Sequence, residues 1–486
     1  MIRGALHLFT GSLVGKILGV VREVLLAAAF GTTGPVAAYR VAQTATLAPV
    51  NFVSADTLSA GFVPVHARLL VTDTRGAQVY YRAVRNLLMA LSVAVTGVLL
   101  VWPHEVARLV APGFSASLAD LTASMLTILA IGIPLYLYTT LASYLEMSHG
   151  VYRIASVRAS VQSIGLIAGV GAAVVTGSPL YLAGGFTLAY ACLAAWAALR
   201  IHRADLAGRP AQVARGEWRS SYETLWAIMR PLLPLPFLLQ GAIVIERMVA
   251  TLVSTEAAAG LDYARVFSDT VVLLVATPLG LASLTAYANA SAREVIERAG
   301  RVILPLFWAG AASAVALGFF GEPLVDLVLG RGAFGEDAID VTTAFLVGLS
   351  VGLPFQLVAY FQAKVLNSQR RNREVLAVVG AGSAVMIAVD LALYEPLGAV
   401  GIGLGASAGA LTQTLVASWR LRLYPALGLA IVAAAPPLGA SVAIELAGPA
   451  LGFDGWVAAL AHAAVWAASA ILTPSLRGAL RSALQR

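Results

Sequence analysis

Long apolar runs recur along the whole of this 486-residue chain, and they restrict what it can fold into. Each run holds about 20 residues, enough for a helix to cross the hydrocarbon core of a bilayer, which is about 30 Å thick. A backbone in lipid must satisfy its own hydrogen bonds, and a helix does so within one segment. Charged residues make up only 12% of the chain, far below the average of about 25% for soluble proteins. The sequence therefore predicts an all-α polytopic membrane protein.

The apolar runs and the breakers between them predict fourteen membrane spans. They lie near residues 8–30, 37–66, 83–102, 121–147, 157–176, 180–199, 228–254, 260–288, 302–320, 341–366, 375–394, 397–419, 424–446 and 455–473. If the amino terminus is cytoplasmic, 23 arginines fall in cytoplasmic segments and only Arg108 and Arg331 fall outside. The positive-inside rule then places both termini in the cytoplasm. The net charge of +7 follows from this topology, so no nucleic-acid partner is expected.

Two stretches of the chain resemble each other at a separation of 220 positions. Residues 131–150 read IGIPLYLYTTLASYLEMSHG, and residues 351–370 read VGLPFQLVAYFQAKVLNSQR. The same register pairs Phe114 with Phe334, Asp120 with Asp340, Thr122 with Thr342, Ser148 with Ser368 and Arg153 with Arg373. Agreement among charged and punctuating residues indicates an internal repeat.

The repeat predicts the domain organisation. It carries the fourth span onto the tenth and skips six spans, so both copies run in the same direction and form two pseudo-symmetric six-helix lobes with a cleft between them. The predicted parts are an N-lobe at 1–203, a cytoplasmic linker at 204–224, a C-lobe at 225–423, and two further spans with a tail at 424–486.

Basic residues inside the predicted spans carry the functional argument. A charge near mid-membrane costs roughly 2.5 to 3.5 kcal/mol on insertion scales, so it normally faces a protein interior or a watery cavity. Arg22 and Arg247 are 225 positions apart, as are Arg40 and Arg265, so the repeat makes them pseudo-symmetric pairs. Together with Lys16 they predict a cationic cavity. The planar donor fork of arginine matches phosphate oxygens, so the expected ligand is a phosphate or pyrophosphate.

Acidic residues accompany these cations. Those expected to support the cavity are Glu23, Asp56, Glu246, Asp262 and Asp269. Asp262, Arg265 and Asp269 have the spacing of one helical face. The alternative is that these charges neutralise one another as buried structural pairs. Asp390, in the eleventh span, is a candidate ligand for a coupling cation, or else a buried acid hydrogen-bonded to neighbouring helices.

Motifs for other chemistry are missing from the sequence. It contains no phosphate-cradling GxxxxGK[ST] motif, so no built-in ATPase is expected. The six histidines lack metal-ligand spacing, and no Ser/His/Asp set can be argued, so neither a metal site nor an enzyme is expected. No cofactor is predicted. Transport would instead be driven by a monovalent cation or by the membrane potential, worth about 2.3 kcal/mol per charge per 100 mV.

An ordered series of short segments resembles a known family. The segments are GKILGVVREVLLAAAFG, LSAGFVPVHARL, LVAPGF, LGRGAF and PLGAVGIGLGAS. They are similar to the lipid II flippase family (MurJ/MviN) of the multidrug/oligosaccharidyl-lipid/polysaccharide exporter superfamily. The resemblance covers essentially the whole chain, including the last two spans. It implies a transporter in the bacterial cytoplasmic (inner) membrane that moves an undecaprenyl-pyrophosphate-linked saccharide outward by alternating access.

The resemblance also leaves alternatives. Where the family has Tyr-Ala-Asp-Arg, this chain has Tyr263, Ala264, Arg265 and Val266, so the arginine is displaced by one residue. Besides lipid II, the substrate could be a different lipid-linked polysaccharide repeat unit. Two other functions are a cation-coupled multidrug antiporter of the same superfamily and a non-transporting scaffold. The implied partners are the lipid-linked saccharide, the phospholipid bilayer and proteins of cell-envelope synthesis.

Overall fold

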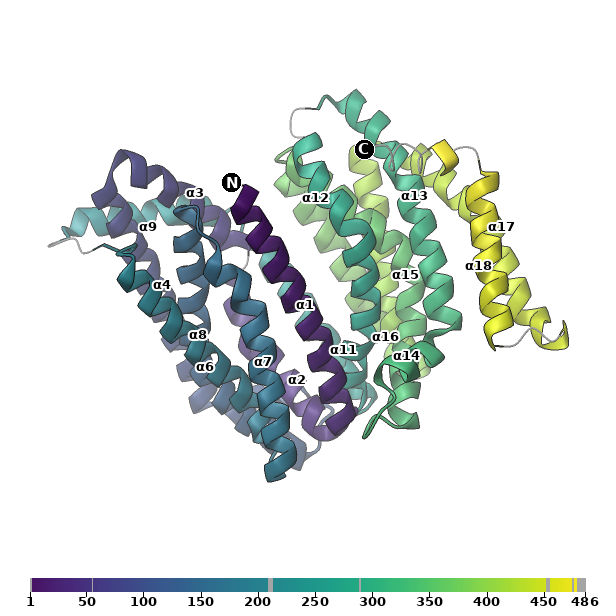
Figure 1. Ribbon diagram of the computed structural model, residues 1–486, viewed down its shortest axis with the longest axis horizontal. Coiled ribbons are helices and arrows are strands. Elements are labelled where there is room, and N and C mark those ends of the chain that lie inside the picture. Colours follow the sequence, from purple (N-terminus) through teal and green to yellow (C-terminus); the bar gives the residue numbers. More distant parts are fainter. Residues whose placement is uncertain are drawn as a thin grey trace. The chain divides into compact units, whose positions relative to one another are not determined.

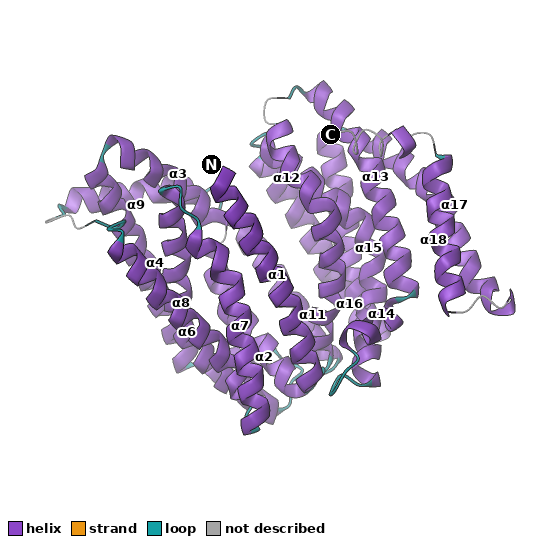
Figure 2. Ribbon diagram, viewed as in Figure 1, coloured by secondary structure: helices purple, strands orange, loops and turns teal. Residues whose placement is uncertain are grey.

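Helices form nearly all of the described chain (Figure 1). The structure, a computed structural model, describes residues 2–54, 56–208, 213–287, 290–451, 455–473 and 476–478. Within these ranges the chain forms helices and loops but no strand (Figure 2). The predicted all-α class is confirmed.

Eleven helical segments of the described chain are long and apolar enough to cross a membrane. They are α4 (Thr74–Val101), α6 (Ala116–Ser148), α7 (Arg153–Thr176), α8 (Leu180–Arg203), α10 (Pro234–Val253), the run of α11 (Ala257–Val271), η1 (Val272–Ala276) and α12 (Thr277–Ala286), α13 (Ala292–Phe319), α15 (Glu336–Ser368), α16 (Asn372–Leu421), α17 (Tyr424–Leu451) and α18 (Gly455–Leu472). The first predicted span coincides with α1 (Ile2–Phe30), and the second with α2 (Gly34–Ser54) and α3 (Asp56–Thr72). The shorter helices are α5 (Pro103–Val110), α9 (Arg215–Met229) and α14 (Gly321–Leu329).

One helix, α16, accounts for two predicted spans. Its helical geometry is interrupted at Gly398, where φ is 54° and ψ is −130°, two residues after Pro396. A positive φ suits glycine because a side chain there would be strained. The break falls at the second residue of the predicted span 397–419, so it separates that span from 375–394 and every predicted span has a helical counterpart.

The chain divides into two compact units. Unit 1 comprises residues 1–259 and 331–335, and unit 2 comprises residues 260–330 and 336–486. In unit 1, α6 packs against α2, α3, α4, α5, α7 and α8. In unit 2, α15 packs against α12, α13, α14 and α16, while α17 packs against α13 and α18. This division follows packing and places α10 with unit 1, whereas the predicted lobes follow the repeat; the lobe boundaries stay a prediction.

The repeat is visible in the helices and their hydrogen bonds. The bounds of α15 are those of α6 displaced by 220 positions, and each helix holds 33 residues. Thr187 Oγ1 donates to Ile128 O at 2.9 Å, and Ser407 Oγ donates to Gly348 O at 2.6 Å. Donors and acceptors in these two bonds are again separated by 220, so both copies use the same packing frame.

Residues 331–335 belong to unit 1 because they dock on the end of α1. Ala333 N donates to Ala28 O at 2.8 Å. Gly31 has a φ of 57°, and an added Cβ there would overlap Ala333 O. The matching loop in the first copy docks on α10, since a Cβ at Gly113 would overlap Thr251 O. The segments LVAPGF and LGRGAF, two of those that resemble the flippase family, therefore contain the loops that pack on the ends of α10 and α1.

The predicted linker at 204–224 is only partly a loop, because α9 begins at Arg215. Glu217 in its first turn accepts from Ala214 N at 2.7 Å and from Arg75 Nε of α4 at 3.1 Å. An acid is favourable at a helix N-terminus because it faces unsatisfied N–H groups. The Ala214 backbone bond, followed by Arg75, lowers the pKa of Glu217.

Candidate functional site

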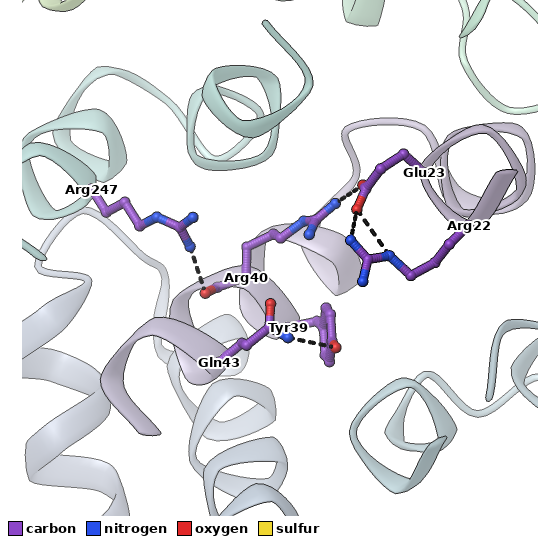
Figure 3. A network of polar contacts seen from close by, with 6 residues as sticks. All are labelled: Arg22, Glu23, Tyr39, Arg40, Gln43 and Arg247. Carbon is purple, nitrogen blue, oxygen red and sulfur yellow. Dashed lines mark hydrogen bonds and ion pairs between the residues drawn. The ribbon is translucent and has the colours of Figure 1, made fainter. Parts of the chain in front are cut away.

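Two helices of unit 1 bring arginines onto one carboxylate (Figure 3). On α1, Arg22 donates to Glu23 Oε1 through Nε at 3.1 Å and Nη2 at 2.5 Å. On α2, Arg40 Nη2 donates to the other oxygen, Glu23 Oε2. Both carboxylate oxygens thus carry a charge-assisted hydrogen bond, which is stronger than a neutral one.

Burial makes this pairing necessary. Glu23 and Arg40 are each only 6% exposed, and Arg22 is partly buried. Removing one partner of such a pair would leave an uncompensated charge in a poorly solvated place. The geometry therefore fits a site in which an anion must always accompany the guanidinium groups.

A third arginine reaches the same region from α10. Arg247 Nη1 donates to Arg40 O at 3.0 Å (Figure 3). It also donates to Thr44 Oγ1. Beside it, Gln43 Nε2 donates to Tyr39 Oη at 3.1 Å. The structure thus brings together Arg22, Arg40 and Arg247, three of the four arginines that the sequence singled out.

The other predicted residues of unit 1 have different surroundings. Lys16 is exposed on α1 and forms no ion pair with the residues that the structure describes. Glu246 is buried on α10, next to Arg247. The side chain of Asp56 lies outside the described part of the structure. Lys16 and Asp56 therefore gain no structural support as members of the cluster.

Arg265 lies on α11 in unit 2, with Asp262 and Asp269 on the same helix. Asp262 and Arg265 are partly buried, and Asp269 is exposed. The helix continues into the π-helical segment η1, and Pro278 opens α12. A π-helical turn is uncommon and often occurs near a functional site. The place of Arg265 in a four-arginine set stays a prediction.

Asp390, the predicted cation ligand, is completely buried on α16. A Cβ at Gly405 would overlap Asp390 Oδ1, so this glycine leaves the space that the carboxylate occupies. Gly403 lies against Phe345 O and Gly348 in the same way. These glycines serve close helix packing, as their position inside a span indicates.

Sequence reasoning missed Arg158, which it assigned to a cytoplasmic segment. The structure places Arg158 five residues after the start of α7, with its guanidinium 4.5 Å from the centre of the Tyr136 ring. Its position so close to the helix end resembles that of an ordinary interfacial arginine, so only the aromatic neighbours distinguish it.

Unit 1 also contains an apolar cavity of about 420 Å³. It lies among α2, α4, α5 and α10, with Pro49, Phe52, Val98, Val106 and Val244 in its lining. None of the charged site residues lines it. Such a cavity suits hydrocarbon and not an anionic group.

The fold and the buried cations define a class: polytopic membrane transporters built from a duplicated helical frame. The solved lipid II flippase MurJ in an inward closed conformation matches with a TM-score of 0.80 and 15% identity, covering 95% of this chain and 97% of that one. An inward-facing multidrug resistance MATE family transporter of the MOP superfamily matches with a TM-score of 0.68 and 13% identity, covering 85% and 95%. At these identities the matches establish the fold alone.

The family follows from the sequence match. The family model described as lipid II flippase MurJ matches residues 26–448. A Rhizobium meliloti (strain 1021) protein named probable lipid II flippase MurJ is 26% identical over 429 residues, which cover 84% of this chain and 76% of that protein. The chain therefore belongs to the MurJ lipid II flippase family, and it is a multi-pass membrane protein.

Proposed function

We propose that this protein is a flippase that moves lipid II, an undecaprenyl-pyrophosphate-linked saccharide, from the inner to the outer leaflet of the bacterial inner membrane. Family membership supports this assignment. The observation that carries it for this chain is the pair of arginines, Arg40 buried and Arg22 partly buried, that share Glu23, with Arg247 beside them.

In this proposal, Glu23 occupies the place of an anion when no substrate is bound. Arg22 and Arg40 each use part of a five-donor guanidinium on its oxygens. An incoming pyrophosphate offers more oxygens and more charge, so it displaces Glu23 and takes those donors. When the head group leaves on the other side, Glu23 returns and the buried cations are neutralised again.

The remaining steps involve no bond chemistry. The head group crosses through the protein while the polyprenyl tail stays in the bilayer, beside α17 and α18. Both termini lie in the cytoplasm. A monovalent cation at Asp390, or the membrane potential acting on the arginines, resets the empty protein. Cell-envelope synthesis proteins supply and consume the substrate.

The test is rescue of a bacterial strain depleted of its essential lipid II flippase. Wild type should rescue growth, and Arg22→Ala, Arg40→Ala, Arg247→Ala and Arg265→Ala should not, at equal membrane abundance. Arg230→Ala is the matched control because Arg230 is exposed at the end of α9. Failure of a well-expressed wild type would instead favour a different lipid-linked saccharide.

Glu23→Gln separates a substrate site from a structural ion pair. If Glu23 only stands in for the substrate, this variant should keep rescue relative to its membrane abundance, because the arginines remain for the pyrophosphate, although the loss of the buried charge should lower that abundance. If the cluster is structural, Glu23→Gln should fail in the same way as the arginine variants. Membrane abundance of each variant, measured by immunoblot, shows which of these has occurred.

Coupling is tested at Asp390. Transport into vesicles should depend on the coupling cation in wild type and lose that dependence in Asp390→Asn. Retained dependence in this variant would place the cation elsewhere.

Labelling of a cysteine introduced at position 210 tests the topology, since it should react only from the cytoplasmic side.

A further inference from the structure

A second polar cluster lies in unit 1, around Arg158. Its members come from four helices: Asn51 from α2, Tyr136 from α6, Arg158 and Gln162 from α7, and Tyr190 from α8. The guanidinium carbon of Arg158 is 4.5 Å from the centre of the Tyr136 ring and 5.9 Å from that of Tyr190. Arg158 Nε donates to Tyr190 Oη at 3.4 Å. Two aromatic rings thus hold the cation in place.

The hydrogen bonds within this cluster use its acceptors. Tyr136 Oη donates to Asn51 Oδ1 at 2.9 Å, and Tyr190 Oη donates to Gln162 Oε1 at 3.1 Å. The N–H donors that these bonds leave over are the side-chain amide groups of Asn51 and Gln162 and the terminal nitrogens of Arg158. A ligand rich in oxygen acceptors suits such a set.

No carboxylate among the described residues pairs with Arg158. This distinguishes it from Arg22 and Arg40, which share Glu23. Arg158, Gln162 and Asn51 are partly exposed, so a ligand can reach their donors. A cation within a membrane bundle that has donors to spare and no internal acid is suited to an external ligand.

The cluster is close to Arg22 on α1. A Cβ at Gly15 would lie 2.7 Å from the Cβ of Ala159, so Arg158 and Lys16 are at the same level of the packed pair α1 and α7. Arg22 is six residues further along α1, about 9 Å at the helical rise. Tyr190 interacts electrostatically with Arg22 as well as with Arg158. A head group held at Arg22 could therefore extend to Arg158.

We infer that Asn51, Tyr136, Arg158, Gln162 and Tyr190 form a saccharide subsite next to the pyrophosphate site, an inference that rests on the proposed function. Amide and guanidinium N–H groups donate to the hydroxyl and carbonyl oxygens of the sugar. The partly exposed Tyr136 ring offers an apolar surface to its C–H groups, while the buried Tyr190 holds Arg158 and Gln162 in place. Charge alone would attract any phosphate, but two neutral amides beside a partly exposed aromatic ring fit a neutral, oxygen-rich sugar better.

The experiment measures binding in nanodiscs that contain zwitterionic lipid only. The probes are undecaprenyl pyrophosphate and the same lipid with its saccharide. Arg158→Gln and Gln162→Glu are compared with Arg153→Gln, an exposed position at the start of α7, and with Arg22→Gln. Gln162→Glu keeps the helix face intact, because a carboxylate four residues after Arg158 pairs with it and occupies its donors.

Wild type should bind the saccharide-bearing lipid more tightly than the bare one. Arg158→Gln and Gln162→Glu should weaken the saccharide-bearing lipid about tenfold and leave the bare lipid within twofold, while Arg153→Gln changes neither. Arg22→Gln should weaken both lipids. A merely structural role for Arg158 would alter both lipids alike and so would overturn the inference.

Other outcomes separate the possible sources of ligand oxygens. Equal affinity of wild type for the two lipids would refute the subsite and leave the proposed function standing. If wild type binds neither lipid, the proposed function fails and the subsite with it. A repeat with phosphatidylglycerol in the nanodiscs tests a phospholipid head group: competition by phosphatidylglycerol that Arg158→Gln abolishes, with no effect of the saccharide, would assign the cluster to phospholipid.

Discussion

The two copies of the repeat share a helical frame but differ in the polar groups that it carries. The bonds from Thr187 to Ile128 and from Ser407 to Gly348 are equivalent, which establishes the correspondence. At the positions of Arg158, Gln162 and Tyr190, the second copy has Val378, Gly382 and Ala410. The donor-rich cluster therefore exists only in the first copy.

The converse holds for the buried acid. Asp390 of the second copy corresponds to Val170 of the first, and both residues are buried. The first copy thus carries a cluster of donors, and the second a buried carboxylate, where the other copy has apolar residues or glycine. Close helix packing is kept in both copies, while the polar side chains beside it differ.

The largest expected loss of stability comes from introducing into the first copy the acid that the second copy has at Asp390. Val170→Asp places a carboxylate where Val170 is only 6% exposed, and the cost should be about 3 kcal/mol. We expect the yield of monodisperse protein and the thermal transition in detergent to fall sharply. The reciprocal variant Asp390→Val should fold, because it removes a buried charge. A stable Val170→Asp protein would mean that both copies have a site able to hold an acid.

A smaller effect is expected where the copies pack with different tightness. A Cβ at Gly352 would lie 2.5 Å from Ser407 Cα, whereas a Cβ at Gly132 would lie 3.2 Å from Thr187 Oγ1. Backbone cannot move aside as readily as a side chain, so Gly352→Ala should cost about 1–3 kcal/mol. Gly132→Ala should cost under about 1 kcal/mol. Equal shifts of the thermal transition would contradict the difference in tightness.

The smallest loss of stability is expected from removing the two equivalent hydrogen bonds between helices. Thr187→Val and Ser407→Ala each remove a hydroxyl that donates to a carbonyl of the neighbouring helix. Each loss should cost about 1 kcal/mol, the usual net value of one hydrogen bond. Denaturant or thermal unfolding should therefore give similar values for the two variants. A difference above about 1 kcal/mol would show that the two copies do not rely on the frame equally.

Predictions made from the sequence succeeded where one physical signal dominated. The fourteen apolar runs all coincide with helices, because lipid requires helical backbone over a definite length. The repeat at 131–150 and 351–370 could be recognised because proline and glycine interrupt the apolar sequence at equivalent positions in both copies.

The site was predicted less completely. The sequence made Arg22 and Arg247, and Arg40 and Arg265, counterparts in the repeat but named no contact between them. The structure shows that Glu23 joins Arg22 and Arg40 and that Arg247 donates to the backbone of α2. Sequence spacing reports position along a helix, but it does not report which neighbouring helix supplies the partner. Arg158 was overlooked for the same reason, since its tyrosine neighbours come from α6 and α8.

The sequence by itself determined that this protein spans a membrane, that its frame is duplicated and that cations lie within its spans. Those properties depend on local composition and on the spacing of the internal repeat, both of which can be read from the sequence alone. Only the tertiary structure decided which charges meet, that Gly405 makes room for Asp390, and that Arg158 lies against a pair of aromatic rings. These depend on how separate helices cross, and crossing is set by the packing of many side chains at once.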